Sequence, residues 1–205
     1  MEILLQGLGK KFNQDWIFKN VSVEFVSGIS NAIIGPNGSG KSTLLKIISG
    51  FLLPTEGNIG YVREGKSINS EEYYKFIDFP APYLELIDEM TLEEFLQFHF
   101  QFKDLNKDID IATLPEMMFL DKDQKKYIGN FSSGMKQRLK IGLGIFSDSP
   151  VLLLDEPTTN LDNDSKNWFK DSFNKIKKEK LIILASNESE DIDLCDKKIN
   201  LLNFK

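Results

Sequence analysis

The sequence predicts an α/β fold in which helices cover a mostly parallel sheet. Two continuous apolar runs, residues 151–154 and 181–185, are typical of strands that are buried on both faces. A third short apolar segment, residues 31–35, ends at a glycine and is followed by apolar residues at helical spacing. Buried strands that alternate with helices indicate an α/β fold around a parallel sheet.

The N-terminal third adds shorter elements to this core. Residues 2–5 and 21–26 are predicted strands, the second because apolar and polar residues alternate along it. A helix is expected from Lys41 to about Gly50, where the glycine is a plausible helix end. Residues 54–62 and 63–68 carry glycine and proline, and are interpreted as turns between short strands.

A helical lobe is expected between the two halves of the core. From Glu89 to about Lys126 the pattern is helical, and a second helix is expected over residues 131–146, which open with the small hydroxyl residues 132 and 133. The sequence therefore predicts a single domain over 1–205, with a core lobe at about 1–82 and 131–205 and a helical lobe at about 83–130. One face of the first helix carries Leu92, Phe95, Leu96, His99 and Phe102.

Composition narrows the class of protein. The 205 residues are 41 % hydrophobic and 27 % charged, as in an ordinary soluble domain. A net charge of −6 argues against a nucleic-acid binder that relies on a basic field. Cys195 is the only cysteine, so no internal disulfide is possible and a reducing compartment fits. The apolar runs are too short to cross a bilayer, so any membrane role is expected to come through a partner.

The segment GPNGSGKS, residues 35–42, matches the phosphate-binding pattern G-x-x-x-x-G-K-[ST] between a predicted strand and a predicted helix. Its glycines let successive N–H groups point at phosphate oxygens, and the helix adds its positive dipole end. Lys41 would neutralise the β and γ phosphates, and the Ser42 hydroxyl would ligate Mg²⁺. The expected nucleotide-binding residues here are Gly35, Pro36, Asn37, Gly38, Ser39, Gly40, Lys41, Ser42 and Thr43.

Two acids end the predicted strand at 151–155. Asp155 and Glu156 should point in different directions, because side chains alternate along a strand. One carboxylate could then reach the Mg²⁺ shell while the other faces the attacking water, a division that suits phosphoryl transfer. We expect Asp155 to be the metal ligand beside Ser42.

These motifs, together with FSSGMKQR at 131–138 and NLD at 160–162, make the chain resemble the nucleotide-binding subunit of ATP-binding-cassette (ABC) transporters over nearly its whole length. The resemblance implies a P-loop NTPase core with a mostly parallel sheet, an N-terminal antiparallel β portion and an inserted helical subdomain. It implies ATP and Mg²⁺ as cofactors, and two chains that meet head to tail around two ATP molecules.

The resemblance also implies roles for single residues. Ser132, Ser133 and Gly134 match the signature segment, usually LSGGQ, that contacts the γ-phosphate held by the other protomer. Glu156 matches the general base, and Asp162 matches the loop that couples the two sites. Phe12 lies where an aromatic ring stacks on adenine, with Trp16 as a nearby rival.

Two positions depart from the family pattern. Pro82 aligns with a glutamine that ligates Mg²⁺, with Glu85 close by, and proline has no side-chain oxygen to replace it. Asn187 takes the place of a histidine that contacts the γ-phosphate. Asparagine can still donate a hydrogen bond, but it carries no charge and shuttles no proton. We expect slow hydrolysis that depends on Glu156, Lys41 and Asn187.

The leading hypothesis is a Mg-dependent ATPase subunit that drives a separate membrane permease, and is held at the inner face of the cell membrane by it. The runner-up is an ATP-gated dimerisation switch with weak hydrolysis and no transport role. A DNA-maintenance ATPase is disfavoured by the acidic charge, and a GTPase by the lack of an N-K-x-D segment. The phenylalanines of residues 95–102 are interpreted first as lobe core, and otherwise as a patch for a permease segment.

Overall fold

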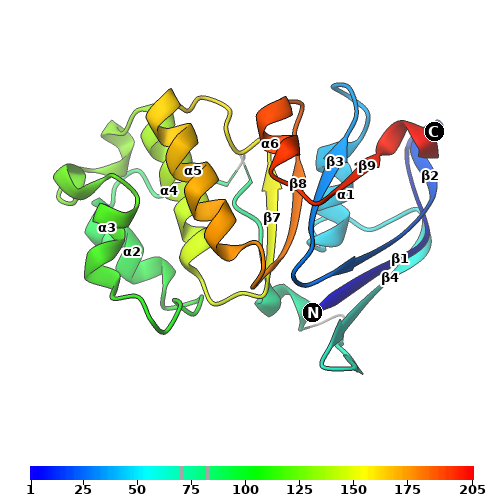
Figure 1. Ribbon diagram of the computed structural model, residues 1–205, viewed down its shortest axis with the longest axis horizontal. Helices are drawn as coiled ribbons and strands as arrows, with labels where there is room; N and C mark the ends of the chain where they lie inside the picture. Colours follow the sequence, from blue (N-terminus) through cyan, green and yellow to red (C-terminus); the bar gives the residue numbers. More distant parts are fainter. Residues whose placement is uncertain (70–71, 82–83) are drawn as a thin grey trace.

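The computed structural model describes residues 1–69, 72–81 and 84–205. Its centre is a five-stranded parallel sheet in the order β6-β7-β8-β3-β9. In Figure 1 this sheet lies between a helical lobe on the left and an antiparallel sheet on the right. The strands are β3 (Ser30–Ile34), β6 (Ile77–Asp78), β7 (Val151–Asp155), β8 (Leu181–Ala185) and β9 (Lys197–Asn200).

Alternation along these strands explains their continuous apolar runs. Leu152 and Leu154 of β7 belong to a core shared with the helices, whereas Val151 and Leu153 belong to a core shared with the antiparallel sheet. Every residue of β7 and β8 is buried, because both faces of the sheet are covered. The prediction of an α/β fold around a parallel sheet is therefore confirmed.

The antiparallel sheet is longer than expected from the sequence. Its order is β2-β1-β4-β5, formed by β1 (Glu2–Phe12), β2 (Asp15–Val26), β4 (Glu56–Arg63) and β5 (Lys66–Ser67). The interpretation of residues 54–62 as turns is wrong. A Cβ on Gly57 would lie 2.4 Å from the Gly7 carbonyl oxygen, so this glycine allows two backbones to approach closely within the sheet.

The helices differ in how well the sequence predicts them. The expected helices after the phosphate loop and after residue 132 are present as α1 (Lys41–Ile48) and α4 (Ser133–Phe146). Among the described residues, the other α-helices outside the lobe are α5 (Asn163–Ile176) and α6 (Ser189–Asp193).

The helical lobe is less regular than predicted. Between residues 89 and 126 the α-helical segments are α2 (Leu92–His99) and α3 (Leu114–Met117), joined by turns and 3₁₀ segments. Phe102 lies beyond the end of α2 and is exposed, so it does not share the buried face of Phe95 and Leu96. The turn-forming residues Asn106 and Asp110 follow, and their side-chain oxygens accept from the Asp108 and Ala112 N–H groups, which favours loops.

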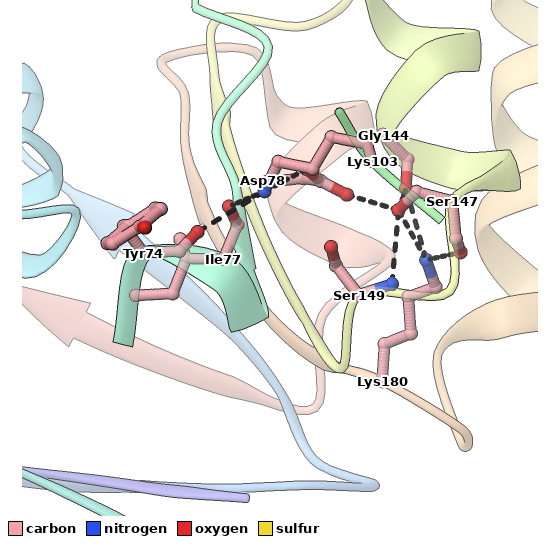
Figure 2. A network of polar contacts seen from close by, with 8 residues as sticks. All are labelled: Tyr74, Ile77, Asp78, Lys103, Gly144, Ser147, Ser149 and Lys180. Atoms are coloured by element: carbon pink, nitrogen blue, oxygen red, sulfur yellow. Dashed lines mark hydrogen bonds and ion pairs between the residues drawn. The ribbon is translucent and has the colours of Figure 1, made fainter. Parts of the chain in front are cut away.

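A buried polar network joins the lobe to the core (Figure 2). Lys103 Nζ donates to the carbonyl oxygen of Ile77 at 2.9 Å and pairs with Asp78 Oδ1 at 3.0 Å. On the other side of Asp78, the Ser147 hydroxyl donates to its second carboxylate oxygen. Lys180 Nζ donates to the Ser147 carbonyl oxygen at 2.6 Å and to that of Gly144 at 3.1 Å. The end of α4 is thereby fixed against β6 and the start of β8.

Candidate nucleotide site

The parallel sheet brings three loops to one edge. The phosphate loop follows β3, Asp155 is the last residue of β7 and Glu156 comes directly after it, and Asn187 lies in the loop after β8. Because β3 and β7 both neighbour β8, their carboxyl ends meet where ligands usually bind to open α/β sheets. A pocket of about 390 Å³ lies there, lined by Ile17, Asn37, Gly38, Ser39, Gly40, Lys41, Ser42, Thr43 and Glu156.

Glycine makes the shape of this loop possible. Gly40 precedes α1 with φ of 106°, and a Cβ there would lie 2.4 Å from Ile17 Cγ2. Gly38 also has positive φ, 77°, although the space around it is open. Side chains disfavour this left-handed region, so glycine keeps the loop tight at low strain. The first N–H groups of α1 are left free to bind an anion at this end of the helix.

Lys41 is buried at the centre of the pocket. Its Nζ donates to the Gly35 carbonyl oxygen and to Asn187 Oδ1, both at 2.9 Å, and lies 3.6 Å from Glu156 Oε1. The lysine therefore joins all three loops. A bound triphosphate would offer this ammonium group stronger, charged acceptors than the neutral carbonyl and amide oxygens.

Asp155 has the properties expected of a metal ligand. Its carboxylate is buried and hydrogen-bonded to the Ser42 side chain, and burial raises its pKa. Within the part of the chain that the structure describes, its Oδ1 has no hydrogen-bond partner. An unsatisfied buried carboxylate oxygen is costly, and a hard cation would satisfy it. Ser42 and Asp155 thus fit Mg²⁺, which usually takes one or two protein ligands besides water and phosphate.

Glu156 contacts the loop that follows β8. It has φ of 47°, an uncommon value for a residue with a side chain. The Asn187 N–H donates to its Oε2 at 3.2 Å, and the Ser186 hydroxyl lies at 3.2 Å from the same oxygen. The expected difference in direction between Asp155 and Glu156 is present, since Asp155 contacts Ser42 and Glu156 faces Lys41.

Asn187 bridges the phosphate loop and the acidic strand end. Its Nδ2 donates to Asn37 Oδ1, its Oδ1 accepts from Lys41, and its backbone N–H holds Glu156. This residue lies where the sequence predicts it, next to the pocket. Its neutral amide supplies hydrogen bonds but no positive charge.

The predicted adenine and signature residues lie outside the pocket lining. Phe12 is 47 % exposed, with Lys10 Nζ 5.0 Å from its ring centroid. Ser132 caps α4, and its Oγ accepts from the Met135 N–H at 3.2 Å. Ser133 is exposed on the first turn. Gly134 packs so closely that a Cβ would lie 3.1 Å from the Asn160 carbonyl oxygen.

Three other predicted positions have the following surroundings. Asp162 caps α5, where the Ser165 N–H donates to its Oδ1 at 2.8 Å and lowers its pKa. Trp16 has its ring next to Lys19, with Nζ 4.4 Å from the centroid. Pro82 lies outside the described residues. Glu85 is exposed and lines a different pocket, together with Lys136 and Lys140.

Some residues at this edge carry no signal in the sequence. Ile17 lines the pocket from β2, and Lys205 Nζ donates to the carbonyl oxygens of Ile17 at 2.8 Å and Ser39 at 3.1 Å. Ser186 and Asp191 lie behind Glu156 in a buried hydrogen-bond chain. All four are brought to the site by tertiary folding, and only the position of Ser186 beside Asn187 in the sequence could have suggested it.

Comparison with known proteins identifies the family. The family model described as ABC transporter matches residues 18–159. The chain is 35 % identical, over 92 % of its length and 87 % of the relative, to an uncharacterized ABC transporter ATP-binding protein, YybJ, of Bacillus subtilis. It is 33 % identical, over 99 % of its length and 79 % of the relative, to the energy-coupling factor transporter ATP-binding protein EcfA1 of Thermotoga maritima. The chain belongs to the ABC transporter family, as one of its ATP-binding subunits.

Solved structures agree with the fold. A putative ABC transporter ATP-binding protein of Pyrococcus furiosus superposes with a TM-score of 0.80 at 25 % identity, with full coverage of both chains. A dimeric ATP-binding cassette bound to ADP and Pi has the same fold, with a TM-score of 0.78 at 22 % identity over 97 % of this chain and 93 % of the other. The chain spans only about a quarter of the length of several related ABC transporter A family members from Dictyostelium discoideum.

Proposed function

We propose that the chain binds and slowly hydrolyses Mg-ATP, and that ATP closes two such subunits head to tail to drive a separate permease. The observation that carries this proposal is the orphaned Asp155 Oδ1 beside Ser42, at the mouth of a glycine loop with a buried lysine. A site with these residues would hold a cation beside a triphosphate.

The residues would divide the work as follows. The loop amides and Lys41 hold the β and γ phosphates, while Ser42 and Asp155 would hold Mg²⁺. When bound there, Mg²⁺ would neutralise part of the negative charge of the phosphates. Glu156 accepts a hydrogen bond from the attacking water and orients it toward the γ-phosphate. Asn187 donates one hydrogen bond to a phosphate oxygen, and hydrolysis is slow because this donor is neutral.

Turnover of Mg-ATP by the purified chain tests the catalytic assignment. Glu156→Gln keeps the shape and the hydrogen bond from the Asn187 N–H but removes the base, so we expect turnover to fall by about a hundredfold or more while ATP is still bound. If both proteins hydrolyse ATP at the same rate, the role of Glu156 is wrong.

The runner-up function remains an ATP-gated switch in which dimerisation is the output. It is favoured by Asn187, whose neutral side chain holds Lys41 and Asn37 without adding charge to the site. Glu156→Gln separates the two functions: a switch would support its cellular role with this variant, whereas a transporter subunit would not.

We further propose that the permease binds at a second pocket. Among the described residues, this pocket shares no lining residue with the phosphate pocket. This cavity of about 330 Å³ is mostly apolar and has Asp78, His99 and Lys103 among its lining residues. Phe51, 76 % exposed, and Tyr74 belong to its rim, and the predicted phenylalanine patch at 95–102 contributes only His99. The part of the chain described by the structure contains no helix long and apolar enough to span a membrane, and the relatives are named as transporter subunits.

Co-purification tests this surface. The chain should be recovered with a polytopic membrane protein from detergent-solubilised membranes. Phe51→Asp should abolish this recovery and leave the ATP turnover of the isolated subunit unchanged. Recovery that survives Phe51→Asp would place the permease elsewhere.

A further inference from the structure

A chain of buried polar side chains lies behind Glu156. The Ser186 Oγ lies 3.2 Å from Glu156 Oε2 and 2.8 Å from Asp191 Oδ2. The Thr158 hydroxyl donates to the same Asp191 oxygen at 3.0 Å. Ser186, Asp191 and Thr158 are all buried, and none of them was expected to belong to the site.

These groups come from three elements that surround the site. Ser186 follows β8 and precedes Asn187, Asp191 lies in α6, and Thr158 follows Glu156 after β7. Asp191 therefore bonds to both of the segments that carry Glu156 and Asn187. Its carboxylate fixes the spacing of these two segments from behind the pocket.

The single hydroxyl hydrogen of Ser186 limits which hydrogen bonds this residue can donate. A serine hydroxyl has one hydrogen, so Ser186 donates to only one of the two carboxylates at a time. The distance to Asp191 is the shorter, and the Glu188 N–H donates to the Ser186 oxygen at 3.0 Å. With Asp191 as its acceptor, the Ser186 hydroxyl is turned away from Glu156. Glu156 then keeps the unshared electron pairs that a water-activating carboxylate needs.

The surroundings of Asp191 change the pKa of its carboxyl group. Desolvation raises the pKa of the Asp191 carboxyl, and the nearby Glu156 and Glu188 carboxylates raise it further, against the hydrogen bonds from Ser186 and Thr158. A buried carboxylate with acidic neighbours lowers the free energy of unfolding. A role in the site explains its presence.

We propose that Asp191 is a positioning residue for hydrolysis: by accepting the Ser186 hydroxyl hydrogen it keeps that hydrogen away from Glu156, and it fixes the segment whose Asn187 N–H orients the Glu156 carboxylate. The inference rests on the proposed ATPase function. It predicts that Asp191 acts on the chemical step and leaves ATP binding alone, because none of Thr158, Ser186 and Asp191 lines the phosphate pocket.

Steady-state kinetics with Mg-ATP on the full chain tests the proposal. Asp191→Asn keeps the shape of the side chain but replaces a charged acceptor with a neutral one, so the Ser186 hydrogen is held less strongly and can turn toward Glu156. We expect kcat to fall roughly tenfold, the size of one charged hydrogen bond, with KM for ATP unchanged. Ser186→Ala should also lower kcat, because the segment that carries the Asn187 N–H is then no longer fixed to Asp191. In the Ser186→Ala background, Asp191→Asn should have no further effect, because the path through the hydroxyl is already cut.

Asp196→Asn is the matched control. Asp196 also accepts a hydrogen bond from a serine hydroxyl, that of Ser30 at 2.7 Å, but it is not connected to Glu156. Its substitution should leave kcat unchanged. The denaturation midpoint and the affinity for ATP, measured by calorimetry, show for each variant that the fold and the pocket are intact.

The possible outcomes distinguish a failure of the role of Asp191 from a failure of the proposed ATPase function. A wild-type kcat in Asp191→Asn or in folded Ser186→Ala would overturn the role of Asp191, as would additive losses in the double variant. In both cases turnover that depends on Glu156 would leave the proposed function standing. Absence of any turnover in the wild-type chain would overturn both.

Discussion

Asn187 holds three polar groups in place at the site. It accepts from Lys41, donates to Asn37 through its side chain, and donates to Glu156 through its backbone. Lys41 is consequently engaged by protein acceptors, and a triphosphate must displace these to bind the ammonium. Asn187 thus holds these groups without adding a charge, whereas the histidine that the family resemblance implies for this position could carry one.

Replacing this residue tests whether the lost charge limits the rate. Asn187→His restores a group that donates a hydrogen bond and can carry a proton. We expect kcat for Mg-ATP to rise, by roughly tenfold if one charged donor is gained. Asn187→Ala, which removes the side-chain bonds to Lys41 and Asn37, is the control and should lower it. A lower rate in Asn187→His would mean that this pocket is adapted to the asparagine.

The phosphate loop depends on a glycine that the local packing requires. Gly40→Ala would force a side chain into φ of 106° and place its Cβ 2.4 Å from Ile17 Cγ2. We expect a loss of about 2–4 kcal/mol in the free energy of unfolding, measured by chemical denaturation without nucleotide. Gly38→Ala is the matched control, since its φ of 77° gives a similar strain in open space. Equal losses in both variants would show that packing on Ile17 contributes nothing.

The sequence predicts the elements around this loop because each carries its own pattern. Three apolar strands, the glycine loop and α4 follow from local residues, and their order along the chain brings Lys41, Asp155 and Asn187 to one edge. The strand β4 has no local strand pattern, because its glycines are typical of turns. The need for glycine at 57 comes from its close approach to the Gly7 carbonyl oxygen across the sheet. The contacts of Asp191 and Lys205 depend on tertiary folding, which leaves no local pattern to detect.

The junction between the two lobes contains a buried cation whose titration affects the whole molecule. Burial lowers the pKa of Lys180 from 10.5 to about 8, despite its hydrogen bonds to the Gly144 and Ser147 carbonyl oxygens. Between these pH values the unfolded chain binds more protons at this residue than the folded chain does. The contribution of Lys180 to stability therefore rises with pH through this window.

Lys180→Met tests this linkage. The free energy of unfolding of the wild-type chain should increase relative to that of the variant between pH 8 and 10.5, by up to ~3 kcal/mol for the full shift. Chemical denaturation of both proteins at several pH values gives the difference directly. Parallel curves for the two proteins would show that Lys180 is not titrating in this range.

The proposed ATP-closed dimer makes a separate prediction for the molecule as a whole. In the presence of ATP, the Glu156→Gln variant should migrate as a dimer in size-exclusion chromatography with light scattering. Adding Ser133→Glu places an acid on the exposed first turn of α4, where it suits the helix dipole but repels a phosphate. The double variant should stay monomeric with an unchanged unfolding midpoint. Dimers in spite of Ser133→Glu would exclude this segment from the interface.

We propose above all that the glycine loop and Asp155 together form a Mg-ATP site. Calorimetric titration with ATP, with and without Mg²⁺, tests it most directly when the wild-type chain is compared with Asp155→Asn and Lys41→Ala. We expect the wild-type chain to bind ATP more tightly with Mg²⁺, Asp155→Asn to lose that difference, and Lys41→Ala to lose most of the affinity. Binding that is indifferent to Mg²⁺ and to both substitutions would contradict the account.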